Sequence, residues 1–383
     1  MAAEQYWEEI YQKLDEKLQA ECLRLGDKIP YIPEDGHYQE DMKKDRLAFW
    51  TNGFWAGILW QMYHGSKKEI YKETARKNGE AMSTAFLHFT ELHHDVGFQF
   101  LHTAVADYRL TGDETAKGHG LHAAGILAGR FNPAGNFIRA WNDNNGKGLG
   151  ADNENKAGWM IIDCLMNIPL LYWAGEELND PRFAYIADQH AHTALKVLMR
   201  PDGSCNHIAV LDPVTGELKE NPGGQGYASG SSWSRGQSWA VYGFALAYLH
   251  TGKQEYLDAA KQSAHYFIAN VSGTDYVSLV DFRSPKEPVY WDTTATACAA
   301  CGLLQIAELV PEYEKALYYD NGVRMLTALI QKHCDWNTGT DGILQNGTAM
   351  YWREHDRHVP IIYGDYFLVE GVLRLLGKSF LIW

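Results

Sequence analysis

The 383-residue sequence has no run of 18 apolar residues, so no transmembrane helix is expected. Its opening stretch, MAAEQYWEEIYQKLDEKL, has the pattern of an acidic amphipathic helix and lacks the apolar segment of a secretory signal. Basic residues are in deficit, with 34 Lys and Arg against 48 Asp and Glu. Binding to nucleic acid or to an anionic membrane needs clustered basic side chains. The sequence therefore predicts neither nucleic acid nor a membrane as a partner.

Cysteine is also scarce, and its six residues are scattered: Cys22, Cys164, Cys205, Cys298, Cys301 and Cys334. In a chain of this length they form no disulfide framework, and we expect a reducing, cytoplasmic environment. Cys298 and Cys301 have the CxxC spacing but lie in the apolar run ATACAACGLLQIAEL. This context favours two small core residues over redox or metal chemistry, which is the alternative.

Strand signals are few, and the dominant period of the apolar residues is helical. Five times a short turn precedes a helical segment, at Gly65-Ser66, Thr111-Gly112-Asp113, Asn179-Asp180, Thr251-Gly252 and Pro311-Glu312. The turns are roughly 50 to 70 residues apart, so the chain has room for about six helix pairs. Such a repeat predicts either an open solenoid or a closed toroid of helix pairs.

The loops distinguish these two architectures. TNGFWAG, HHDVGF, GGQGYASGSSWSRGQ and YGDYF are rich in Gly, Trp and Asp, and all of them differ. A solenoid would have more uniform linkers, whereas distinct loops after alternate helices suit a toroid whose loops converge on one end. We therefore predict an all-α fold, a single (α/α)6 barrel (six-hairpin toroid) over residues 1–383. Short β-ribbons are expected in the loops, around Ser204–Leu211 and Tyr276–Arg283.

Asp163 is the strongest candidate for a catalytic residue. It lies in GWMIIDCLMNIPLLYW, where we expect a helix with apolar residues on every side. Burial disfavours a charged carboxylate, so the pKa of Asp163 should rise toward neutrality, as a general acid requires. A structural role, capping a helix or pairing with a core arginine, is the alternative.

Asp95 is the second candidate, in the motif HHDVGF at residues 93–98. Two carboxylates from different helix pairs that face one cavity are the functional groups of glycoside hydrolysis. The His-His-Asp run could instead bind a metal. It is more compact than a helical His-x-x-x-His site, and no third ligand cluster accompanies it, so we expect no metal.

The glycine-rich segment Gly224–Trp239 is a candidate substrate loop. Arg235 and Trp239 are four residues apart and should project from one face of the helix that follows. An arginine beside a tryptophan suits a sugar acid, because the guanidinium can bind the carboxylate while the indole stacks on the ring. The alternative is an Arg-Trp pair that only braces the loop. Trp55, Trp141 and His207 lie next to loops or turns and are either cavity residues or ordinary core and surface residues.

These segments together resemble the unsaturated glucuronyl hydrolases, glycoside hydrolase family 88. The likeness runs from about residue 50 to residue 376 and rests on a set of motifs in order: WTNGFWAGILW (50–60), HHDVGF (93–98), AW (140–141), IIDCLMNIPLL (161–171), QG…SSWSRGQSWAVYGFAL (225–246), WDTTATACAACGLLQIA (291–307) and YGDYFLVEGVLRLL (363–376). The resemblance implies an (α/α)6 barrel without metal or cofactor. It also implies a cytoplasmic monomer or homodimer that acts on unsaturated uronyl disaccharides of the chondroitin or hyaluronan type.

The resemblance also implies roles for individual residues. Asp163 matches the family's general acid/base, and Asp95 matches its assisting carboxylate. The positions that match substrate contacts are Trp55, His94, Trp141, His207, Gln225, Gly226, Trp233, Arg235, Trp239 and Tyr351. The spacing around Tyr351, in GTAMYWREHDRH, departs from the family. Some members hold a substrate sulfate with Ser and Lys in that loop, where this chain has Arg353, Arg357 and His358.

Three other functions are compatible with the same barrel. An unsaturated rhamnogalacturonyl hydrolase would perform the same chemistry on pectin fragments, but HHDVGF and SSWSRGQSW favour the glucuronyl type. An N-acylglucosamine epimerase-like isomerase would use histidines as acid and base. A non-catalytic sugar-binding protein would not need the two aspartates, Asp95 and Asp163.

Overall fold

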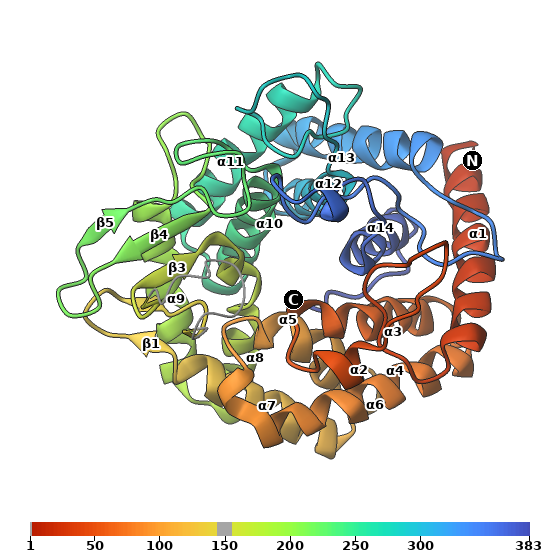
Figure 1. Ribbon diagram of the computed structural model, residues 1–383, viewed down its shortest axis with the longest axis horizontal. Coiled ribbons are helices and arrows are strands. Elements are labelled where there is room, and N and C mark those ends of the chain that lie inside the picture. Colours follow the sequence, from red (N-terminus) through yellow and green to blue (C-terminus); the bar gives the residue numbers. More distant parts are fainter. Residues whose placement is uncertain (1, 144–154) are drawn as a thin grey trace.

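A computed structural model describes residues 2–143 and 155–383 of the chain, and Figure 1 shows helices arranged in two concentric rings. The outer ring contains the helices whose apolar residues lie on one face only. Its members are α1 (Ala2–Leu25), α4 (Glu69–Ser83), α7 (Glu114–Ala128), α9 (Pro181–Val197), α11 (Gln254–Val271) and α13 (Glu312–Lys332). Five of them begin at one of the five turns that the sequence identified or within three residues after it. At two of these turns an aspartate caps the helix: Asp113 accepts from the backbone N–H of Ala116, and Asp180 from that of Arg182.

The inner ring is buried on most of its faces. It consists of α3 (Phe54–Ser66), the continuous run α5 (Val96–Phe100), η3 (Leu101–Val105) and α6 (Ala106–Thr111), then α8 (Pro169–Leu178), α10 (Ser234–Thr251), α12 (Thr293–Leu309) and α14 (Ile362–Leu375). Because α14 packs against both α12 and α3, the last inner helix closes the ring onto the first. The predicted (α/α)6 barrel is therefore confirmed for the described residues. None of the helices among them is long and apolar enough to cross a membrane.

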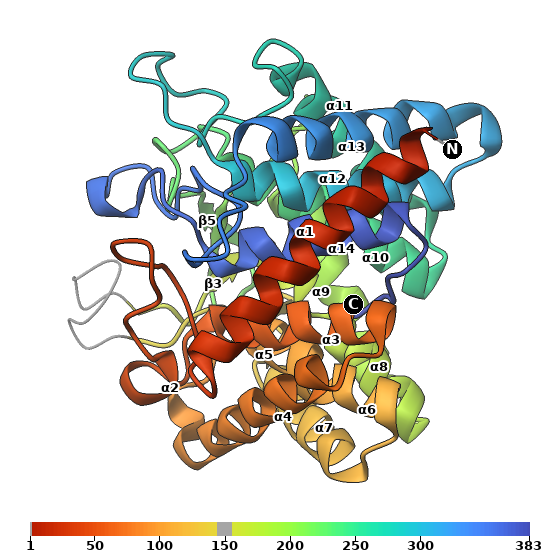
Figure 2. The same cartoon turned by 90° about the vertical axis from the view of Figure 1, so that its right-hand side faces the viewer.

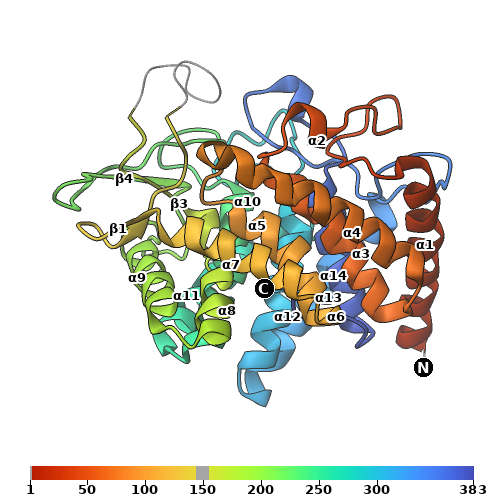
Figure 3. The same ribbon diagram turned by 90° about the horizontal axis from the view of Figure 1, so that it is seen from below.

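The loops that carry most of the candidate site residues gather at one end of the barrel. Figure 3 shows α2 (Met42–Asp45) and β4 (Ile208–Leu211) at this end, with the N-terminus at the other. Figure 2 shows the same separation from a perpendicular direction. The remaining short helices are the 3-10 turns η1 (Trp50–Gly53), η2 (Thr84–Glu91), η4 (Ile162–Met166) and η5 (Glu354–Asp356).

Two small antiparallel sheets accompany these loops. One pairs β1 (Phe131–Asn132) with β2 (Phe137–Ile138), and the other has the order β3 (Trp159–Ile161), β4, β5 (Leu218–Glu220). The register of the second sheet places Ile161 opposite Ile208. The ribbon predicted around Ser204–Leu211 is thus confirmed in its second half.

Two predictions about local structure are wrong. Residues Trp159–Ile161 form a strand, and Asp163 lies in the 3-10 turn η4, not in a continuous apolar helix. Tyr276–Arg283 forms no regular strand and has only isolated bridges, from Leu279 to Trp291 and from Asp281 to Trp233. In this segment the Asp281 carboxylate takes the place of a strand ladder, because it accepts from the backbone N–H of Arg283 and from those of Tyr227 and Ser232 in the glycine-rich loop.

The centre of the barrel is filled by aromatic side chains. Trp383 is 1% exposed, and its indole donates to Glu370 across 3.1 Å. Its ring centroid lies 4.5–6.0 Å from the rings of Phe98, His102, Tyr242, Tyr366 and Phe367, all on inner helices. Cys298 and Cys301 are fully buried on α12, which confirms them as core residues. The helical inner ring therefore encloses a packed core.

Gly243 on α10 allows close packing against η4, the turn that carries Asp163. A Cβ atom at this position would lie 2.4 Å from Cβ of Leu165. We expect Gly243→Ala to lower the free energy of unfolding by about 1–3 kcal/mol, because the two elements must move apart. Urea unfolding measures this change.

Gly118→Ala on α7 is the matched control. Gly118 is exposed, and no non-neighbouring atom of the described chain lies within 4 Å of the position of its Cβ. An alanine there should stabilise the protein by about 0.5–1 kcal/mol, as expected for glycine in a helix. A Gly243→Ala variant as stable as wild type would contradict tight packing of α10 on η4.

Candidate active site

Asp163 is placed by the end of strand β3. The backbone N–H of Ile162 donates to the carbonyl oxygen of His207, which continues the pairing of β3 with β4 into the turn η4. The Asp163 side chain is 16% exposed, and its Oδ1 atom is buried without a hydrogen-bond partner among the described residues. Apolar neighbours on both sides in the turn, Ile162 and Cys164, are fully buried. The carboxyl group is thus largely removed from water.

This environment favours the protonated form of Asp163. Burial raises the pKa of Asp163 well above its usual value, and the nearby Asp95 carboxylate raises it further, while the positive charge of Arg235 acts in the opposite direction. A carboxylic acid that keeps its proton near neutral pH can act as a general acid. The burial predicted from the sequence is therefore present, although a strand and a turn create it.

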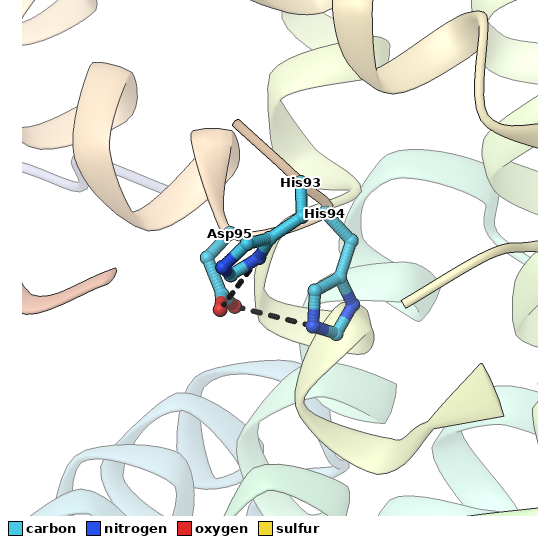
Figure 4. Close-up of side chains that lie close together, drawn as sticks. All are labelled: His93, His94 and Asp95. Carbon is cyan, nitrogen blue, oxygen red and sulfur yellow. Dashed lines mark ion pairs between the residues drawn. The ribbon is translucent and has the colours of Figure 1, made fainter. Parts of the chain in front are cut away.

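Asp95 has a different environment, shown in Figure 4. It directly precedes α5 and is 4% exposed. Nδ1 of His93 lies 3.2 Å from Oδ2 of Asp95, and Nε2 of His94 lies 3.4 Å from Oδ1. The side-chain amide of Asn167 also donates to Oδ1, across 3.3 Å. Burial raises the pKa of Asp95, but the histidines and the amide lower it by more, so the pKa lies below the usual value. The group is therefore ionised where Asp163 is protonated.

His94 lies between the two carboxyl groups. Its Nε2 is 3.4 Å from Oδ1 of Asp95 and 3.6 Å from Oδ1 of Asp163. Burial lowers the pKa of His94 to about 3, even though Asp95 acts to raise it, so the ring is neutral at ordinary pH. A neutral imidazole separates the carboxylates without adding a charge.

His93, His94 and Asp95 also form the one group of three metal-ligand side chains found among the described residues, with ligand atoms within 4.8 Å of one another. The two histidine nitrogens face different oxygens of the same carboxylate, as Figure 4 shows. In this arrangement the ligand atoms are directed at each other. The contacts described above are sufficient to hold Asp95 in place.

Arg235 lies in the first turn of α10 and is 1% exposed. Its guanidinium lies 4.3 Å from the ring centroid of Trp233 and 5.1 Å from that of Tyr363. Nη1 donates to the Thr348 carbonyl and to the Tyr363 hydroxyl, and Nη2 donates to the Ala349 carbonyl across 2.8 Å. Three of its five N–H donors are thus used, and Nε has no hydrogen-bond partner within the described structure.

The predicted pairing of Arg235 with Trp239 is wrong. Trp239 is 1% exposed and packs on Phe98 and Phe367, with centroid distances of 5.3 and 5.6 Å. The aromatic partner of Arg235 is instead Trp233, two residues earlier. Trp233 has an extended backbone conformation just before the helix begins, which allows its ring to fold back over the guanidinium.

His207 and Gln225 connect the strand β4 region to the glycine-rich loop. The His207 ring lies 4.2 Å from the Trp233 ring, and its Nδ1 accepts from the backbone N–H of Gln225. A Cβ atom at Gly224 would lie 2.1 Å from this nitrogen, so glycine is required there. Burial lowers the pKa of His207 to about 3, and the charge of Arg235 lowers it further. Gly226 lies just beyond, and its backbone N–H closes a tight turn onto the carbonyl of Gly223.

The loop at residues 347–358, GTAMYWREHDRH, is called the late loop, and it contacts the same set of residues through Gln225. The Gln225 side chain donates to the Ala349 carbonyl, and its backbone carbonyl accepts from the N–H of Tyr351. Tyr351 is 5% exposed and contacts the rings of Tyr227 and Tyr290, at 5.1 and 5.4 Å.

Arg353, Arg357 and His358, which stand where some family members have Ser and Lys, have partners within the protein. Arg353 pairs with Asp356 across 3.7 Å, and Arg357 lies over the Tyr290 ring at 4.1 Å. Nε2 of His358 accepts from the backbone N–H of Trp291.

The two remaining candidates have no hydrogen bond or ring contact with this set among the described residues. Trp55 is 1% exposed in the core at the start of α3. Trp141 is half-buried and packs against Trp159 at 5.7 Å, with the ammonium of Lys156 5.4 Å from both rings. The structure thus joins Asp95, His94, Asp163, Arg235, Trp233, His207, Gln225 and Tyr351 into one continuous site.

Sequence reasoning missed two residues of this region. Asn167 contacts both aspartates, and its only signal is its position four residues after Asp163. Asp281 holds the glycine-rich loop, because it accepts from the backbone N–H groups of Tyr227 and Ser232 and from the Ser231 hydroxyl. Its partners lie about 50 residues earlier in the sequence, and no local sequence pattern indicates such contacts.

Comparison with known proteins gives a consistent result. The family model described as Glycosyl Hydrolase Family 88 matches residues 27–293. An unsaturated glucuronyl hydrolase of Bacillus sp. (strain GL1) is 36% identical over 357 residues, which cover 92% of this chain and 92% of that protein. An unsaturated chondroitin disaccharide hydrolase of Streptococcus pneumoniae is 34% identical, covering 87% of this chain and 83% of that protein.

The fold comparison agrees. A crystal structure of the unsaturated glucuronyl hydrolase from Bacillus sp. GL1 superposes with a TM-score of 0.88 at 34% sequence identity. The superposition covers 96% of each chain.

Because Asp163 and Asp95 have opposite environments, replacing each of them with asparagine should change the stability of the protein in opposite directions. The folded protein favours protonated Asp163, whereas the unfolded chain ionises this group above pH about 4. The ionisable Asp163 therefore reduces the free energy of unfolding as pH rises from about 4 toward its raised pKa. Asp163→Asn removes this effect and should raise Tm by about a few degrees at neutral pH, with no gain near pH 3.

Asp95→Asn should lower Tm at neutral pH. The pKa of Asp95 is lowered in the folded state, so its ionised form stabilises the protein above the unfolded pKa, and this stability is lost as pH falls. Thermal unfolding of both variants between about pH 3 and 8 measures the two effects. Shifts of the same sign would show that the carboxyl groups do not differ as described.

Proposed function

The chain belongs to Glycosyl Hydrolase Family 88 and is a hydrolase, and on this premise we propose that it removes the terminal unsaturated uronic acid from lyase-generated disaccharides of the chondroitin or hyaluronan type. The observation that carries the proposal is the pair of aspartates, one held protonated and the other ionised, beside a buried arginine. The names of the relatives support the substrate class.

The reaction begins with protonation of carbon. The substrate uronate has a C4=C5 double bond, and the ring oxygen on C5 makes this bond an enol ether. Protonated Asp163 donates its proton to C4, and positive charge develops at C5 and the ring oxygen. Ionised Asp95 stabilises this charge, and because its pKa is lowered it remains available as an anion while Asp163 is an acid.

Hydration then leads to cleavage of the glycosidic bond. Asp163, now a carboxylate, removes a proton from the water that attacks C5, which gives a hemiketal. The hemiketal opens by breaking the bond between C5 and the ring oxygen, which leaves a ketone at C5 and a hemiacetal at C1. The hemiacetal releases the partner sugar. The distance rule for retaining and inverting glycosidases does not apply, because no step displaces the leaving group at C1 directly.

Arg235 is proposed to bind the uronate carboxylate. The Nε–H and one N–H on Nη2 remain available on a guanidinium whose other donors hold the Thr348–Ala349 backbone. A buried charged donor without a partner is costly, and a substrate carboxylate would satisfy it. Trp233 and Tyr363 keep the guanidinium plane fixed.

The alternatives fit the geometry less well. An epimerase-like isomerase needs histidines that gain and lose protons, but burial keeps His94 and His207 neutral, with pKa values of about 3. A cytoplasmic location is part of the proposal, and the six free cysteines are consistent with it. Loss of ultraviolet absorbance from the conjugated double bond, followed with unsaturated chondroitin and pectin disaccharides, tests the proposed reaction and its substrate class. Absence of turnover with every unsaturated disaccharide would overturn the proposal.

Asp163→Asn and Asp95→Asn should both lose turnover while retaining the fold. The first variant lacks the acid, and kcat should fall by about 10²–10⁴-fold. The second lacks the negative charge, and kcat should fall by about 10²–10³-fold. Absorbance assays with circular dichroism as the folding control make the measurement, and substantial turnover in either variant would assign that role to another residue.

Asp163 and Asp95 also determine how the activity of the wild type should depend on pH. Activity should fall as pH rises through the raised pKa of Asp163, and should fall at low pH as Asp95 becomes protonated. A profile that keeps rising toward alkaline pH would contradict a carboxylic acid as the proton donor.

Arg235→Lys should reduce kcat/KM by about 2–3 kcal/mol, because lysine keeps the charge but loses the planar fork. A substrate with its uronate carboxyl esterified should lose a similar amount with the wild type and little more with the variant. If the two penalties simply add, Arg235 only braces the Thr348–Ala349 loop.

A further inference from the structure

Asn167 is a fully buried amide located between the two proposed catalytic segments. It follows the turn η4, which carries Asp163, and precedes α8. Its Nδ2 donates to Oδ1 of Asp95 across 3.3 Å and to the backbone carbonyl of Asp163 across 3.2 Å. Its Oδ1 accepts from the backbone N–H of Phe98 across 2.7 Å. One side chain thus contacts both segments.

The orientation of this amide is determined by its neighbours. Exchanging the amide oxygen and nitrogen would place the oxygen against the Asp95 carboxylate and the Asp163 carbonyl, and would place the NH₂ group against the Phe98 N–H. All three contacts would become repulsive. The amide therefore presents a donor to Asp95 at every pH, unlike the histidines on the other side of the carboxylate.

Gly97 allows the backbone at the start of α5 to approach Asn167 closely. A Cβ atom at Gly97 would lie 2.4 Å from Cα of Asn167 and 2.6 Å from its Oδ1. Only glycine at the start of α5 permits the approach. The motifs HHDVGF and IIDCLMN, which are about 70 residues apart, therefore form one unit through Gly97 and Asn167.

We propose that Asn167 is a positioning residue of the active site, which orients the Asp95 carboxylate and fixes the turn carrying Asp163 against the start of α5. The proposal rests on the proposed function. In this role the Nδ2 group of Asn167 is a neutral donor that favours the ionised form of Asp95, and its Oδ1 is an acceptor that holds the start of α5 in place. Removing the donor should alter both the geometry of the pair and the ionisation of Asp95.

Asn167→Asp is the main test, because it keeps the shape and the acceptor for Phe98 while placing an oxygen against Asp95. Asn167→Ser is the second variant, because its side chain is too short to span both contacts. For both we expect kcat to fall by about 10- to 100-fold while KM changes little. The acidic limb of the pH profile should move to higher pH, since a second carboxylate or a lost donor disfavours ionised Asp95.

Gln61→Glu is the matched control. Gln61 is another fully buried amide, on α3, and it bonds the backbone of Phe380 through both its donor and its acceptor, away from the aspartates. This variant should lower Tm without moving the pH profile. The same substrate, an unsaturated chondroitin disaccharide, is used for all proteins, with Tm measured for each.

The outcomes separate the two proposals. If the wild type does not turn over the disaccharide, the proposed function fails. If the wild type is active and both Asn167 variants keep its kcat and pH profile, Asn167 has no positioning role. Failure of both variants to fold, or a lower Tm with unchanged kinetics, would equally overturn the inference and leave Asn167 as a purely structural residue.

Discussion

Two carboxyl groups that share one buried site repel each other when both are ionised, and the site is organised around this constraint. The protein resolves it by giving the groups different neighbours. Asp95 receives two imidazoles and an amide, whereas Asp163 follows an apolar strand and has a buried oxygen without a partner within the described chain. His94 stays neutral between them. These different contacts favour an acid at Asp163 and an anion at Asp95 at the same pH. Protonation of an enol ether requires both.

Buried aspartates also shape the loops that surround this pair. Asp281 binds the backbone of the glycine-rich loop, Asp292 accepts from the N–H of Thr294 at the start of α12 and from that of Thr348, and Asp365 accepts from the N–H groups of Ile343 and Leu344. Asp281 and Asp365 accept from loop backbone N–H groups in place of a strand partner, and Asp292 also caps α12. Buried carboxylates therefore hold the irregular loops around the aspartate pair, whereas Asp163 itself is placed by the pairing of β3 with β4.

The parts of this structure that could be predicted from the sequence are those with local causes. Four of the five turns before the outer helices contain a residue with positive φ (Lys67, Gly112, Asn179 and Gly252), two of the turns have a capping aspartate, and Asp95 and Asp163 stand in unusual histidine-rich or apolar contexts. Strand β3 could not be foreseen, because its residues are equally suited to a helix and only pairing with β4 decides. Asn167 contacts Asp95 across 72 residues, Asp281 contacts the glycine-rich loop across 50, and Arg235 contacts Thr348 across 113, so these contacts depend on the closed ring.

The aromatic packing around Trp383 fills the centre of the barrel with side chains. Rings from α5, α10 and α14 meet there, and Phe98 belongs both to this packing and to the helix α5 that directly follows Asp95. Because these packed rings fill the centre of the described barrel, we expect a sugar to reach the aspartates from the end where the loops gather, and its products to leave by that same end.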